Sequence, residues 1–143
     1  TNAPSAWPDD IHTAVVAASH TVDLSTAEST GDAYDAIMGV GGTIALVEED
    51  GFMVNGHISA LSMRAKLRSL REKVYNGSTM SAAGVPLFHR SSDRQDIQGA
   101  SRYELDGEPV YFPRNGSMDP STVLMFSGDW SQLVWAVRQD VTY

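Results

Sequence analysis

The chain has 143 residues, 42% of them hydrophobic and 20% charged, which is typical of one globular domain with its own core. It has no cysteine, which excludes disulfide frameworks, thiolate catalysis and cysteine-based zinc sites. Ten basic residues against 18 acidic ones leave a formal charge of −8, which argues against non-specific nucleic-acid binding. Without an apolar run of about 18 residues or a basic leader, we expect neither a membrane span nor a secretory signal.

Residues 1–31 are rich in Ala, Ser and Thr, and we expect them to form an extended segment leading into a domain at 32–143. Within this segment, IHTAVVAAS (11–19) is compatible with a short strand or a helical turn, because its periodicity does not decide between them. The chain begins at Thr1, so we expect a processed product or a piece of a longer protein.

A helix is predicted for residues 32–49, with Asp32 as its N-cap. The glycines of GVGGT (39–43) would each cost about 1 kcal/mol inside a helix, and we expect close packing against a sheet to offset this. A dinucleotide-binding loop is disfavoured because the sixth position of that motif is Ile44. The apolar residues that recur at the helical period are Ala33, Ile37, Val40, Ile44 and Val47.

A short strand, FMVNG (52–56), is predicted next, followed by a second helix over 57–74 that Asn55 caps. A charged stripe on this helix is predicted from the i, i+4, i+7 spacing of three arginines. The stripe has two interpretations, a solvated helix face or a docking surface for acidic loops of a neighbouring subunit. Its members are Arg64, Arg68 and Arg71.

The second half of the chain reads mainly as strands separated by turn residues. A loop is predicted at 76–84 and a tight turn at Asp106-Gly107. The order of elements predicts an α+β fold, a single domain with a central, mostly antiparallel sheet flanked by two main helices. The strands are predicted at 85–88, 110–113, 123–128 and 133–143.

The histidines and carboxylates show no spacing that is typical of a catalytic or metal site. We therefore expect no catalytic residue, no cofactor and no metal. The alternative of a different class is a small hydrolase, in which His57 or His89 would share a pocket with Asp93.

Several motifs follow one another in an order that is known from one protein family. DAYDAI (32–37) opens the first helix, and FMVNGHISALSMRAKL (52–67) runs from a strand through an asparagine into the next helix. Gly-Glu-Pro-Val (107–110) and Gly-Asp-Trp-Ser (128–131) precede a final alternating strand. Over about 32–143 the chain resembles the axial domain of the tailed-phage major capsid proteins, the Hong Kong 97 fold.

The resemblance implies a structural protein without enzymatic activity. Copies would pack as pentamers and hexamers in a virion capsid made in the bacterial cytoplasm, without sequence-specific nucleic-acid or membrane binding. The loop region 76–105 would lie nearest the ring axis, and an encapsulin-type nanocompartment shell is the alternative of the same fold. The predicted subunit-interface residues are Arg64, Arg68, Arg71, His89, Arg90, Asp93 and Arg94.

Overall fold

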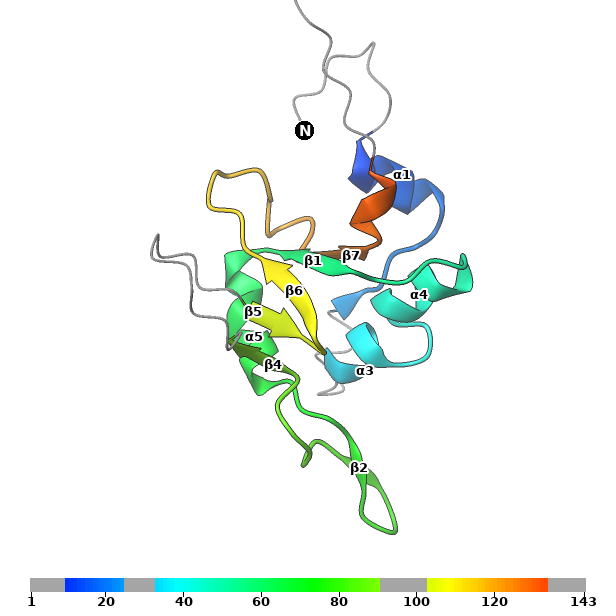
Figure 1. Ribbon diagram of the computed structural model, residues 1–143, viewed down its shortest axis with the longest axis vertical. Helices are drawn as coiled ribbons and strands as arrows, with labels where there is room; N and C mark the ends of the chain where they lie inside the picture. Colours follow the sequence, from blue (N-terminus) through cyan, green and yellow to red (C-terminus); the bar gives the residue numbers. More distant parts are fainter. Residues whose placement is uncertain (1–9, 25–32, 91–102, 134–143) are drawn as a thin grey trace, which may run out of the picture.

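The computed structural model describes residues 10–24, 33–90 and 103–133, which build a small α+β domain (Figure 1). The helices are α1 (Ile11–Ala17), α3 (Ala33–Met38), α4 (Thr43–Glu49) and α5 (Arg64–Ser69), with 3₁₀ turns at Leu61–Met63 and Trp130–Gln132. The strands are β1 (Gly56–Ser59), β2 (Val74–Tyr75), β3 (Met80–Ser81), β4 (Phe88–Arg90), β5 (Tyr103–Leu105), β6 (Glu108–Tyr111) and β7 (Met125–Gly128). The predicted fold class is confirmed.

Five strands form the central sheet in the order β4-β5-β6-β1-β7. Only the β1–β6 pair within this sheet is parallel, and the other three pairs are antiparallel. The turn between β5 and β6 places Asp106 at φ 53° and Gly107 at φ 89°. Two successive positive φ angles suit the right-handed twist of a two-residue hairpin, so the predicted turn at Asp106-Gly107 is confirmed.

The hydrophobic core lies between the helices and one face of this sheet. Side chains alternate along a strand, and Phe88, Leu105 and Val110 all point to the covered face. Leu67 of α5 and Leu105 of β5 have no exposed surface, and burial of such a side chain is worth about 1.5–3 kcal/mol. The buried cluster consists of Ile37, Met63, Leu67, Leu70, Leu87, Phe88, Leu105 and Val110.

The single helix predicted for 32–49 is wrong, because the structure divides it into α3 and α4. Gly41 has φ +76°, a left-handed conformation that breaks the helix. A Cβ atom at Gly39 would lie 2.7 Å from the Asp35 carbonyl oxygen, and one at Gly42 would lie 2.9 Å from the same atom. The glycines therefore allow a tight chain turn and are not there for packing against the sheet. The proposed cap, Asp32, lies outside the described residues.

The helix predicted for 57–74 is also wrong at both ends. Residues 57–59 belong to β1, which is extended because it pairs with β6 on one side and β7 on the other. Helical backbone is limited to the turn at Leu61–Met63 and to α5, while Val74 begins β2. The strand expected at 52–56 is thus displaced towards the C-terminus, and the loop expected at 76–84 contains strand β3.

The N-terminal segment that we expected to be extended contains α1. Asp10 caps this helix, its Oδ1 accepting a hydrogen bond from the Thr13 backbone N–H over 2.8 Å. The division of the chain at 31/32 stays a prediction.

The later strands β4, β6 and β7 begin up to three residues from the predicted positions. The predicted last strand begins at Leu133, and its remainder, 134–143, lies outside the described residues. Within the described ranges, no helix is long and apolar enough to cross a membrane.

Candidate functional site

Strands β1 and β7 are locked together by the segment Gly-Asp-Trp-Ser (128–131). The Asn55 side chain donates to Asp129 Oδ1 over 2.6 Å and accepts from the Trp130 backbone N–H over 2.9 Å. The Trp130 indole N–H donates to the Gly56 carbonyl over 2.9 Å, and a Cβ at Gly56 would lie 3.1 Å from that ring. Asn55 therefore joins two strands, and its predicted role as a helix cap is wrong.

Asp129 holds the short turn that follows β7. Its Oδ1 accepts hydrogen bonds from the backbone N–H and the hydroxyl of Ser131, over 3.0 and 2.6 Å. These bonds, led by the one from the Ser131 hydroxyl, favour the carboxylate and lower the pKa of Asp129. The motif that carried part of the family resemblance is thus a structural clamp.

Positive charge gathers beside the ring of Tyr103 in β5. The Arg64 guanidinium lies 4.3 Å from the centre of the Tyr103 ring and also donates to its hydroxyl. The Arg90 guanidinium lies 6.0 Å from the same ring centre. Cations at such positions are attracted by the negative face of the ring.

Two more aromatic rings hold Tyr103 in place. Phe88 stacks on it with ring centres 5.3 Å apart, and Phe112 meets its edge at 5.8 Å. Arg114 follows Phe112 by two residues and lies close enough to Arg64 to affect its ionisation. Arg68 stands one helical turn beyond Arg64 on α5. We call these four residues the arginine patch: Arg64, Arg68, Arg90 and Arg114.

In the described part of the chain, the charges of the arginine patch are not balanced by ion pairs. Partial burial, and then the charges of the other three arginines, lower the pKa of Arg64. Among the described residues, none of the four has an ion pair with a carboxylate. The buried Arg64 Nε also lacks a hydrogen-bond partner there. The patch is therefore suited to receive an anionic group.

The structure brings together some of the predicted interface residues and separates others. Arg64, Arg68 and Arg90 join in the patch. Arg71 lies beyond the end of α5, in extended backbone bridged to Pro86, so the stripe predicted on one helix is wrong. His89 points to the opposite face of the sheet, where its Nε2 lies 3.3 Å from Glu104 Oε2. Asp93 and Arg94 lie outside the described residues.

Sequence reasoning missed Arg114 as a member of the patch. It follows strand β6 in a stretch that reads only as a loop, 24 residues after Arg90, the nearest arginine or lysine whose structure is described. Strand β6 lies beside β5 in the sheet, and the segment that follows β6 brings Arg114 near Arg64. No local signal reveals this proximity, since it depends on the order of the strands in the sheet.

His57 is the histidine that the structure places in the interior. Its side chain is 2% exposed, and burial lowers its pKa to about 4. Its Nδ1 lies 2.9 Å from the Ser127 hydroxyl, which in turn donates to the Thr43 hydroxyl over 3.4 Å. A histidine–serine pair is the starting point of nucleophilic catalysis, but a base with such a low pKa accepts a proton poorly at neutral pH. Among the described residues, Nε2 has no partner that could orient the ring.

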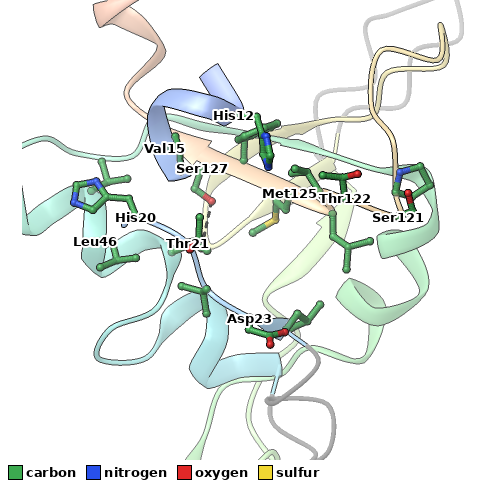
Figure 2. Close-up of a pocket in the computed structure, with 18 residues that line it drawn as sticks. His12, Val15, His20, Thr21, Asp23, Leu46, Ser121, Thr122, Met125 and Ser127 are labelled. Atoms are coloured by element: carbon green, nitrogen blue, oxygen red, sulfur yellow. Dashed lines mark hydrogen bonds between the residues drawn. The ribbon is translucent and has the colours of Figure 1, made fainter. Parts of the chain in front are cut away.

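A groove of about 440 Å³ runs along the free edge of β7 (Figure 2). Its walls come from α1, residues 20–24, α4 and the segment 120–127. Ser127 lines it and Figure 2 shows the hydrogen bond to Thr43 as a dashed line, whereas His57 is not among the lining residues. In the described part of the chain, no three metal-ligating side chains gather in one place.

Known proteins give one informative comparison. No protein-family profile matches the chain, and no curated protein sequence does. Among solved structures, the chain is similar to one entitled "Microbacterium phage Oxtober96", with a TM-score of 0.57 and 24% sequence identity. The alignment covers 90% of this chain but 36% of the other, so the chain spans about a third of the length of that phage protein. The likeness shows a fold shared with a protein of a phage.

Proposed function

We propose that the chain is the axial lobe of a tailed-phage major capsid protein, whose copies pack around capsomer centres in an icosahedral shell. The observation that carries the proposal is the fold shared with a longer phage protein over 90% of this chain. A lobe of a larger subunit accounts for the difference in length. The ordered motifs from DAYDAI (32–37) to Gly-Asp-Trp-Ser (128–131) support the same assignment.

The chemistry of the described residues agrees with a role in assembly. The interior histidine His57 is neutral at neutral pH, and three of the four members of the arginine patch are exposed to solvent. The proposed partners are copies of the same protein in pentamers and hexamers, with neither sequence-specific nucleic-acid binding nor membrane binding. The proposal assigns no catalytic residue, cofactor or metal, and it places the protein in a virion capsid made in the bacterial cytoplasm.

From the sequence we expect the loop region 76–105 to lie nearest the ring axis, but not all of this range is loop. Strands β4 and β5 lie within that range and belong to the central sheet. The β2–β3 hairpin projects from the body of the domain (Figure 1). This hairpin and residues 91–102 are therefore the segments that we propose for the centre of the capsomer.

Electron microscopy of the full-length gene product tests the proposal. We expect closed icosahedral shells built of pentamers and hexamers, and terminase, portal and protease genes beside the coding sequence. Shells that enclose an enzyme encoded next to the gene would favour a nanocompartment instead. A product that stays monomeric at high concentration and hydrolyses ester substrates would contradict the proposal.

A further inference from the structure

A cluster of negative charge lies at the C-terminal end of α4. Glu48, Glu49 and Asp50 are all exposed there, and no basic residue occupies the last turn of the helix. The carbonyl groups at a helix C-terminus already carry partial negative charge, so carboxylates at this end are unfavourable. Asp50 has a partner in His20, whose Nδ1 is 3.4 Å from Asp50 Oδ2. In the described structure Glu48 and Glu49 have no cationic partner. We call these three residues the acidic end: Glu48, Glu49 and Asp50.

The acidic end and the arginine patch lie on opposite flanks of the domain. Helix α4 packs against β7, which is one edge of the central sheet. The arginine patch rests on β4 and β5 at the other edge, together with α5. Figure 1 shows the same arrangement, with α4 on one side of the sheet and α5, β4 and β5 on the other.

Each flank carries like charges that repel one another within a single copy. Arg64 and Arg90 lie over the Tyr103 ring, and the other two members of the arginine patch lie near Arg64, without an ion pair to a described carboxylate. Three carboxylates gather at a helix end that disfavours them. Like charges this close together destabilise the folded copy. Where the described residues supply no opposite charge, such a cluster points to a functional surface. The repulsion within each cluster would be relieved by the opposite charges of the other cluster on a neighbouring copy.

Exposed apolar side chains accompany both clusters. Leu61 is 51% exposed in the turn that leads into Arg64 and α5. Phe52 is 46% and Met53 77% exposed directly after the acidic end. An interface needs apolar area as well as complementary charge, and both flanks offer it.

We propose that the arginine patch of one copy binds the acidic end of a second copy. Because the two surfaces lie on opposite flanks, the contact is head-to-tail, and its repetition closes a ring when the rotation between copies allows closure. The inference rests on the proposed capsid function and names the surfaces that meet between neighbours in a capsomer.

The test uses charge reversal in the full-length protein. Arg68→Glu/Arg114→Glu reverses two exposed members of the patch, and Glu48→Arg/Glu49→Arg reverses two members of the acidic end. Each double variant places like charges in contact, so we expect the yield of shells to fall by roughly tenfold or more. Combining all four substitutions restores opposite charges across the contact and should recover most of the yield. Sedimentation and electron microscopy measure the assembled fraction.

Matched controls carry the same charge changes outside both clusters. Arg71→Glu and Glu72→Arg alter exposed residues that belong to neither surface, and we expect both variants to assemble like the wild type. Circular dichroism melting curves establish that each variant is folded before assembly is compared. A loss of shells in Arg71→Glu equal to that in the patch variant would overturn the specific contact.

Mixing the two double variants tests the head-to-tail geometry. Every contact between unlike variants then joins opposite charges, so the two variants can alternate around a ring that has an even number of members. A pentamer has an odd number of members and keeps one contact between like variants. We expect hexamers in sedimentation and electron microscopy, and no pentamers and no closed shells. If the wild type forms shells and both double variants also do, the inference fails and the capsid function stands. Failure of the quadruple variant to recover, although it is folded, also overturns the inference. If the wild type does not assemble at all, both proposals fail.

Discussion

His57 shows how one buried side chain links the stability of this fold to pH. It lies in β1, one of the strands with a neighbour on each side, and its ring reaches the Ser127 hydroxyl. Burial lowers its pKa from 6.5 to about 4 in the folded protein, so the unfolded chain binds the proton more tightly. Its stabilising contribution is therefore present above about pH 6.5 and is lost as the pH falls towards 4.

The first prediction concerns this histidine. We expect the free energy of unfolding to fall by on the order of 3 kcal/mol between pH 6.5 and 4 because of His57. Urea unfolding at a series of pH values measures the fall. His57→Asn keeps a nitrogen near Ser127 but cannot titrate, so its stability should depend less steeply on pH than that of the wild type. Parallel curves for wild type and His57→Asn would contradict the prediction.

At the scale of one element, the glycines between α3 and α4 decide where the helix ends. In a continuous helix each glycine is a weak point that alanine would strengthen. In the observed turn Gly41 has φ +76°, and its position has open space around it. The backbone conformation, and not a steric clash, is what requires glycine here.

The second prediction uses the opposite effects that alanine has on stability inside a helix and at a position with positive φ. Gly41→Ala should destabilise the protein by about 1–2 kcal/mol, the cost of left-handed backbone for a residue with a side chain. A continuous helix would instead gain about 1 kcal/mol from the same change. Gly41→Asn should cost less than Gly41→Ala, because asparagine tolerates this conformation better. Thermal and urea unfolding measure both variants.

Gly128→Ala is the control for this substitution. Gly128 lacks a positive φ, and apart from its chain neighbours no atom of the described residues lies within 4 Å of the site where a Cβ would stand. Alanine there should be neutral or slightly stabilising. A Gly41→Ala variant that is more stable than the wild type would restore the interpretation of one continuous helix.

At the scale of the whole molecule, folding and assembly use different parts of the chain. The core lies between the helices and one face of the sheet, whereas the arginine patch and the acidic end stand on opposite flanks. Residues 91–102 connect β4 and β5, which are already paired through Phe88 and Leu105. We expect this connection to matter for the capsomer and not for the fold.

The third prediction separates these two properties. Replacement of residues 92–101 by a Gly-Ser linker of equal length should leave the unfolding midpoint of the domain nearly unchanged, because the flanking strands keep their pairing. The same change in the full-length protein should impair shell formation, measured by sedimentation. Replacement of residues 115–117 in another exposed loop should change neither property. Unfolding of the domain by the 92–101 replacement would show that this segment belongs to the core.

The sequence alone determined the features that depend on neighbouring residues. Asp106-Gly107 specifies a tight turn through backbone conformation, and the apolar runs near 110 and 123 specify strands of the sheet. The arginine stripe predicted on a helix over 57–74 holds for Arg64 and Arg68, which both lie on α5. These signals are local, so they do not depend on which strand pairs with which.

Only the tertiary structure decided the features that join distant segments. The pairing of β1 between β6 and β7 made residues 57–59 a strand, although the apolar periodicity further along fitted a helix. Arg64 and Arg90 meet at the Tyr103 ring, and Arg114 lies near Arg64, although the three arginines are far apart in the sequence. The physical reason is that sheet order and register set these neighbours, and local periodicity carries no information about either.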